Sequence, residues 1–318
     1  MRPVGRRALL AAMPAVALAG ASASAAQMKI LLGTAMEGGG VAAYGAALID
    51  ALKSVDPTAE IRSVTTGGIL GNVSMLEAGD LDIALVFGEV AHDLFAGIGR
   101  PPTKLKVVSV MYSTPGMFVV RADSRYRRIG DLRGRPVVWN GRNGGLAVQA
   151  RYVMDGLGLD IDKDFQPIYT ERLSDGPPMV IEGRAAALWG GGLRWPGFVE
   201  VASSSRGARF VVPNAAEIEQ IRAKYAFLMR LVVPGGLYPG QYDPIVTVGS
   251  WSFVLARADL DEAEGYRLAK ALYRIERGGA FSRQLTQTTA KNTLAAIPSP
   301  DVLQPGVLKF YKEKELLQ

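Results

Sequence analysis

The stretch TTGGILGNVSMLEAGDLDIALVFGEVAHDLFAG, residues 65–97, decides the fold. A Gly-rich turn at 66–68 precedes a run whose apolar residues recur at spacings of three and four, which predicts a helix. Gly79 and Asp80 end that helix, and the apolar run 83–87 predicts a buried strand before a second amphipathic segment. This order indicates an open α/β sheet, whose loops line a cleft and whose helix N-termini offer N–H groups to an anion.

Composition restricts the chemistry that this chain can perform. Its 318 residues are 48% hydrophobic and 21% charged, which suits one large or two medium globular domains. The chain has no cysteine and only one histidine, His92, so disulfides, thiolate nucleophiles and metal sites with several His or Cys ligands are excluded. The net charge is +6 without a basic block interleaved with aromatics, so we expect a solvated basic surface and no nucleic-acid partner.

The first 26 residues have the pattern of an export signal. Basic MRPVGRR precedes apolar ALLAAMPAVALAGA, and small residues offer cleavage sites after Ala25 or Ala26. The apolar run is shorter than the roughly 20 residues that a membrane span needs. We therefore expect a signal peptide at 1–26 and a mature protein in the periplasm, and the pair Arg6-Arg7 permits a twin-arginine route.

Two Gly-rich loops, each between a predicted strand and a predicted helix, are candidates for ligand contacts. The first is GTAMEGGG at 33–40, and the second is NGRNGG at 140–145. The first loop has neither GxGxxG in register nor GxxxxGK[ST], which disfavours a nucleotide site. Since we expect one loop in each lobe of the fold, the two can face each other across a cleft.

Four segments together resemble the TAXI family, the solute receptors of a subset of tripartite ATP-independent periplasmic (TRAP) transporters. Residues 65–97 are similar to the first-lobe signature of that family, and IGDLRGRPVV at 129–138 is similar to a strand entry common in two-lobed receptors. VVPGGLYPGQ at 232–241 and LQPGVLKFYKE at 303–313 resemble two later motifs, with Gln304 in place of the usual His, a change that we expect to be structural.

The resemblance implies an α/β fold of two lobes, like the type II periplasmic binding proteins, with a ligand cleft between the lobes and crossing strands that join them. We expect one lobe to comprise 27–116 plus 247–318 and the other to comprise 117–246. The resemblance further implies a receptor that delivers a small organic solute, a carboxylate or an amino-acid-like molecule, to a TRAP-type permease. We expect a monomer without cofactor or metal.

The expected ligand contacts come from both lobes. They are Thr34, Met36, Glu37, Thr66, Gly68, Asn72, Arg142, Asn143, Gly144, Trp189, Gly192 and Trp195. The first loop departs from the family pattern, because an apolar side chain and a carboxylate replace hydroxyls, so the family's glutamate or 2-oxoglutarate is not carried over. A buried carboxylate needs a partner, so Glu37 either points to solvent or meets a donor-bearing or cationic part of the ligand.

Several alternatives remain open at this stage. Arg142 is either a surface residue or a bidentate clamp for a carboxylate, and Trp189 and Trp195 form either a packed loop or a flat wall for the ligand. An enzyme on the same architecture is disfavoured, because no trio of nucleophile, base and orienting residue is visible. The Asp pairs at 80–82 and 160–164 suggest solvated caps, and His92 suggests a surface or core residue. A receptor that reports to a sensor stays possible.

Overall fold

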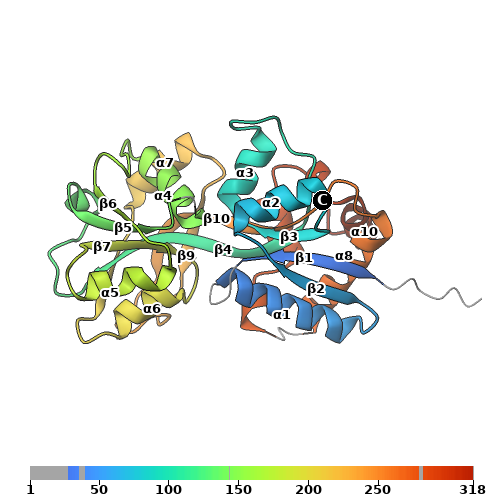
Figure 1. Cartoon of the computed structure of the whole chain (residues 1–318), viewed down its shortest axis with the longest axis horizontal. Helices are drawn as coiled ribbons and strands as arrows, with labels where there is room; N and C mark the ends of the chain where they lie inside the picture. Colours follow the sequence, from blue (N-terminus) through green and yellow to red (C-terminus); the bar gives the residue numbers. More distant parts are fainter. Residues whose placement is uncertain (1–27, 36–39, 143, 279–281, 318) are drawn as a thin grey trace, which may run out of the picture.

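The computed structural model describes residues 28–35, 40–142, 144–278 and 282–317, which form two α/β lobes side by side (Figure 1). The predicted signal peptide at 1–26 lies outside the described residues. Two long strands, β4 (Lys106–Arg121) and β10 (Ile245–Ala256), lie antiparallel and run from one lobe into the other. Within these described ranges, no helix combines the length and the hydropathy that crossing a membrane requires.

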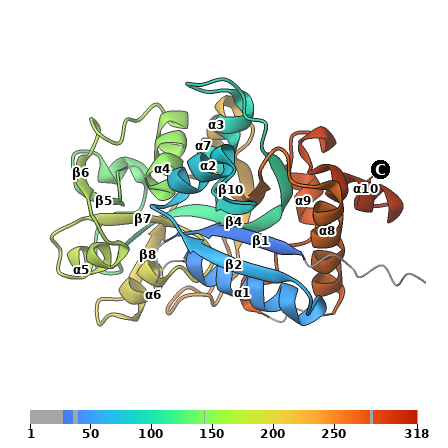
Figure 2. The ribbon, with the colours of Figure 1, turned by 45° about the vertical axis from the view of Figure 1, so that its right-hand side comes forward.

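The first lobe contains a sheet in the order β2-β1-β3-β10-β4. Its first three strands are parallel and its last two are antiparallel to their neighbours: β1 (Lys29–Thr34), β2 (Glu60–Thr65) and β3 (Ile83–Val86) precede β10 and β4. In Figure 1, α1 lies below this sheet and α2 and α3 lie above it, whereas Figure 2 shows α8, α9 and α10 together near the C-terminus. The helices of this lobe are α1 (Gly40–Val55), α2 (Ile69–Ala78), α3 (Gly88–Ala96), α8 (Glu262–Arg277), α9 (Ala290–Ala296) and α10 (Pro305–Glu313).

The second lobe is built on the other half of β4. There β4 pairs antiparallel with β7 and β8, β7 continues in parallel to β5 and β6, and β9 pairs antiparallel with β10. In Figure 1, α4 and α7 lie above this sheet and α5 and α6 below it. The elements are β5 (Pro136–Asn140), α4 (Gly145–Gly156), β6 (Gln166–Tyr169), α5 (Gly176–Ile181), β7 (Ala187–Gly191), α6 (Pro196–Ser203), β8 (Ala208–Val211), α7 (Ala215–Lys224) and β9 (Met229–Val233).

The crossing strand β4 corrects one sequence-based prediction. The sequence predicts two strands, at 106–111 and 117–123, and the segment between them includes the polar and turn-forming residues STPG at 113–116. The structure has one continuous strand, since the ladder changes partner there: Pro115 pairs with Gly249 on β10, and Gly116 pairs with Gly191 on β7. The polar residues therefore mark the passage between lobes and not a turn.

Separate apolar cores support the two lobes. One cluster of buried side chains draws on residues 28–111 and 253–311, and two further clusters draw on residues 117–248. The limits of the lobes along the chain remain a prediction, but each group of elements has an apolar core of its own, as separate domains do.

Gln304 connects the C-terminal helix to the first lobe, in agreement with the structural role expected for it. Its side chain is fully buried, its Oε1 accepts from the N–H groups of Gly306 and Val307, and its Nε2 donates to the carbonyls of Leu260 and Asp261. It therefore caps α10 and fixes the start of α8 at the same time.

We expect Gln304→Ala to lower the free energy of unfolding by about 2–4 kcal/mol, because it leaves buried N–H and carbonyl groups without partners. Urea denaturation followed by circular dichroism measures this change. Gln284→Ala, at an exposed glutamine, serves as the control and should stay within about 0.5 kcal/mol of the parent. Equal stability of the two variants would contradict the capping role.

Candidate functional site

The parallel strands of both lobes end at the crossing segments of β4 and β10. In the first lobe, Val86 at the end of β3 pairs with Phe253, and β10 runs from there toward the second lobe. In the second lobe, Gly191 at the end of β7 pairs with Gly116. The carboxyl ends of the two sets of strands therefore point at each other, and the loops that follow them lie at the position where open α/β sheets bind ligands.

Four predicted contact residues of the first lobe lie together at the ends of β1 and β2. The hydroxyl of Thr66 lies 2.7 Å from Asn72 Oδ1, 2.9 Å from the carbonyl of Thr34 and 3.0 Å from the carbonyl of Gly68. Asn72 is fully buried and donates to the carbonyl of Leu85 at 2.8 Å. These bonds tie the turn at 66–68 to the ends of three strands, so Asn72 and Thr66 fix the shape of the loop.

The ligand contacts predicted from the Gly-rich loop of the second lobe lie at the N-terminus of α4. Gly144 is the N-cap of this helix, without a side-chain cap, and Gly145 is its first residue. Phe87, at the end of β3 in the first lobe, packs so closely on Gly145 that a Cβ there would lie 1.8 Å from the Phe87 ring. The two lobes are therefore in contact at this point. Met36, Glu37 and Asn143 lie outside the described residues.

Of the two alternatives that the sequence allows for Arg142, the structure shows the surface position. Its side chain is 59% exposed, Nη1 lies 3.3 Å from Asp162 Oδ1, and the guanidinium lies 4.0 Å from the centre of the Tyr169 ring. An exposed pair of this kind contributes little free energy. A ligand-clamping role for Arg142 would require the side chain to leave both partners and thus stays a prediction.

The two predicted tryptophans pack inside the second lobe. Trp189 has no exposed surface, and its ring meets those of Phe118 and Trp139 at centroid distances of 4.9 and 6.3 Å. Trp195 is 9% exposed and lies edge-on against Phe198 at 4.9 Å. This arrangement favours the packed-loop alternative. Gly192, the residue directly after β7, has a φ of 101°, and its carbonyl accepts from the Tyr238 hydroxyl.

The structure also shows the partners of two titratable side chains, Asp82 and His92, for which the sequence suggested no role in the site. The interpretation of Asp82 as a solvated cap is wrong, because Asp82 accepts from the Leu31 N–H and pairs with Arg257 at 3.0 Å. His92 stacks on Phe227 of the second lobe with ring centroids 3.9 Å apart, and burial lowers the pKa of its imidazole. His92 is therefore part of the contact between lobes.

Sequence reasoning missed Glu89, the second residue of α3. Its carboxylate is 1% exposed and accepts from the Ser250 hydroxyl on β10 at 2.8 Å. Burial raises the pKa of Glu89 to about 6, although hydrogen bonds from its own N–H, Ser250 and Gln149 oppose the rise. The one sequence feature that could have indicated a buried Glu89 is its position directly after Gly88, at the end of the apolar run 83–87.

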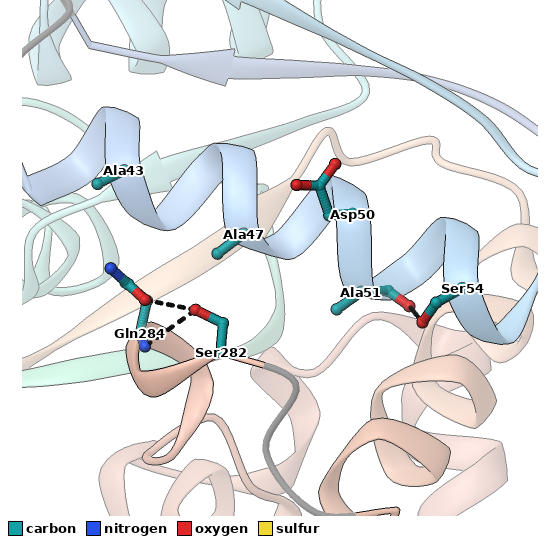
Figure 3. A pocket seen from close by; sticks show the side chains of 7 residues that line it. All are labelled: Ala43, Ala47, Asp50, Ala51, Ser54, Ser282 and Gln284. Carbon is teal, nitrogen blue, oxygen red and sulfur yellow. Dashed lines mark hydrogen bonds between the residues drawn. The ribbon is translucent and has the colours of Figure 1, made fainter.

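The structure has two notable pockets. One, of about 490 Å³, lies beside α1 and is lined by Ala43, Asp50 and Gln284, among others (Figure 3). The other, of about 530 Å³, is mostly apolar and lies between the lobes, lined by α3, β10 and the end of α9 on one side and by residues 226–229 of the second lobe on the other. Neither is lined by a predicted contact residue. Among the residues that the structure describes, no group of three or more His, Asp or Glu side chains could hold a metal ion.

Comparisons with known proteins agree with this architecture. The model of the NMT1-like family matches residues 32–314. The GluR0 ligand-binding core from Nostoc punctiforme in complex with L-glutamate has a TM-score of 0.52 at 9% identity, over 81% of this chain and 98% of that one. An ancestral arginine-binding protein bound to arginine has a TM-score of 0.51 at 11% identity, over 82% of this chain and 98% of that one.

A third solved structure, the periplasmic aliphatic sulphonate binding protein SsuA from Escherichia coli, has a TM-score of 0.48 at 16% identity, over 91% of this chain and 93% of that one. At these identities the first two likenesses show the fold. The two-lobed α/β fold of type II periplasmic binding proteins, predicted from the sequence, is confirmed.

We expect Trp189→Ala to lower the free energy of unfolding by about 3–5 kcal/mol, because it leaves a cavity among the aromatic rings of the second lobe. Thermal or urea denaturation checks this. Leu193→Ala, at an exposed residue in the adjoining loop, is the control. If Trp189→Ala kept the parent's stability but lost solute affinity, the tryptophan would be a wall of the ligand site instead.

Proposed function

The chain belongs to the NMT1-like family, whose model spans residues 32–314, and from this membership and the two-lobed fold we propose that it is an extracytoplasmic solute receptor. The observation that carries the proposal is the meeting of the strand ends of both lobes at the crossing strands, where Phe87 already touches Gly145. Such an arrangement can enclose a solute when the lobes close about a hinge. We accordingly propose a binding protein and not an enzyme.

The electrostatics of the cleft support a small anionic solute, a carboxylate or an amino-acid-like molecule. The first turns of α1, α2 and α4 contain no acidic residue, and neither α2 nor α4 has a side-chain cap. Their N–H groups and helix dipoles are thus available to an anion. The two solved proteins of this fold named above hold L-glutamate and arginine, which are solutes of the size proposed.

The proposal gives the predicted contact residues two different roles. Backbone groups at Gly68, Gly144 and Gly192 would contact the solute, and Thr34 and Thr66 would shape the first-lobe turn. Met36, Glu37, Asn143 and the exposed Arg142 are kept as proposed contacts, whereas the buried side chains of Asn72, Trp189 and Trp195 would act through the packing around the cleft. The proposed lobes are 27–116 plus 247–318 and 117–246.

We further propose that the protein is exported by the signal peptide at 1–26, works as a monomer in the periplasm and delivers its solute to a membrane permease. The TAXI resemblance supports a TRAP-type permease as that partner. A sensor protein in place of the permease is the second candidate, and co-purification of the solute-loaded protein with its membrane partner separates the two.

A thermal-shift screen of the mature protein, from Gln27 onward, against small carboxylates, amino acids and aromatic acids tests the proposed function. A solute at 100 times its dissociation constant should stabilise the protein by about 2.7 kcal/mol, which raises the melting temperature visibly. Recovery of the solute unchanged after incubation supports a receptor. A compound that is consumed during incubation would sink the receptor proposal and favour an enzyme.

We expect Gly145→Ala to weaken solute binding about 5- to 100-fold, because the added methyl would overlap the Phe87 ring and hold the lobes apart. Isothermal titration with the solute from the screen measures the loss, and the melting temperature without solute should change little.

Two variants make this prediction specific. Gly130→Ala is the matched control, because a Cβ at Gly130 meets nothing within 4 Å. Phe87→Leu in combination with Gly145→Ala should recover part of the affinity, since it removes the ring that the methyl meets. Unchanged affinity in Gly145→Ala would show that the solute does not require this contact between lobes.

A further inference from the structure

A buried carboxylate lies where the first lobe, the second lobe and a crossing strand meet. Glu89 is in the first turn of α3, Ser250 is on β10, and Gln149 is on α4 of the second lobe. The Ser250 hydroxyl donates to Glu89 at 2.8 Å, and the Gln149 amide lies close enough to the carboxylate to lower its pKa. Gln149 Nε2 also donates to the carbonyl of Thr114 on β4 at 2.7 Å. The four side chains are all almost fully buried.

The surroundings of Glu89 depend on how the lobes are placed. Phe87, two residues earlier, covers Gly145 at the start of α4. About one turn further along α3, Asp93 accepts from the Tyr152 hydroxyl of α4, and His92 stacks on Phe227. Separation of the lobes would remove α4 from the first turn of α3 and admit water to the carboxylate.

We propose that Glu89 is a positioning residue for lobe closure. Glu89 joins α3 to α4 through Gln149 and to the crossing strand through Ser250, and its protonation is coupled to closure. The inference rests on the proposed function for the movement of the lobes, and it adds a control of that movement by pH. Glu89 acts through Gln149 and Ser250 and does not touch the solute.

The direction of the coupling follows from the burial of the carboxyl group. In the closed arrangement burial raises the pKa of Glu89 to about 6, from an ordinary value of 4.5, and hydration in an open form would return it toward 4.5. The closed form therefore binds the proton more tightly. The protonated carboxyl group therefore favours closure most below about pH 4.5, and this advantage is lost as the pH rises through 6. Between these two limits the equilibrium constant for closure changes by at most about 30-fold.

The other charged groups near Glu89 do not produce the rise in closure on acidification that is expected from Glu89. On α3, Asp93 raises the pKa of Glu89 and is itself bonded to Tyr152, and β10 has no charged residue between Ile245 and Ala256. On α4, Arg151 and Asp155 bond to other partners. His92 has a lowered pKa in this arrangement, so its protonation on acidification would favour the open form, which is the opposite sign.

The test uses the absence of cysteine from the chain. Cysteines introduced at the exposed positions Lys53 on α1 and Ala216 on α7 carry a donor and an acceptor dye, and energy transfer without solute reports the separation of the lobes from pH 4.5 to 8. We expect the closed fraction to rise on acidification with a midpoint between 4.5 and 6. In Glu89→Gln the closure equilibrium should change less than about twofold over this range.

Matched variants assign the response to Glu89. Glu200→Gln, at an exposed glutamate of α6, and His92→Gln should both retain a closed fraction that rises on acidification. Gln149→Met should strengthen the response and raise its midpoint, because it removes a second-lobe donor that lowers the pKa of Glu89 in the closed form. A parent protein without pH response, or a Glu89→Gln variant that responds like the parent, would overturn the inference. Since no solute is present, either result is separate from the outcome of the solute screen.

Discussion

The main-chain pairing of β4 with β10 is the interaction on which the rest of the structure depends. The ladder joins Gly249–Ala256 to Lys106–Pro115, and both strands then continue into the sheet of the other lobe. Because the two strands are the crossing point, the parallel strands of each lobe end beside them and their loops face each other. Two register shifts in the ladder add local twist, which turns one sheet relative to the other.

Close approach of backbone to backbone makes this crossing possible. A Cβ at Gly249 would lie 2.0 Å from the Thr114 carbonyl, and one at Gly88 would lie 2.2 Å from the Trp251 carbonyl. Neither carbonyl can move without breaking the ladder, so glycine is required at both positions. The start of α3 is thereby held against the crossing strand, which is the reason why Phe87 and Glu89 reach the second lobe.

Polar groups buried at the crossing are bonded to partners from distant parts of the chain. Thr247 donates to the Gly116 carbonyl at 2.7 Å, and Gln149 reaches the Thr114 carbonyl. These bonds offset the cost of burying polar groups and fix the register of the two strands. Glu89 differs from them because its carboxyl group can lose a proton, and burial raises its pKa to about 6.

The sequence by itself determined the order of most strands, glycine turns and helices, because apolar periodicity and glycine punctuation are local properties. The two-lobed fold was what the resemblance of four segments to a receptor family implied. The sequence also indicated the structural role of Gln304. Only the tertiary structure decided which side chains face the cleft: Trp189 is enclosed by Phe118 and others, and Glu89 is buried by residues more than fifty positions away along the chain. Burial and pKa depend on such distant contacts, which a pattern of neighbouring residues does not contain.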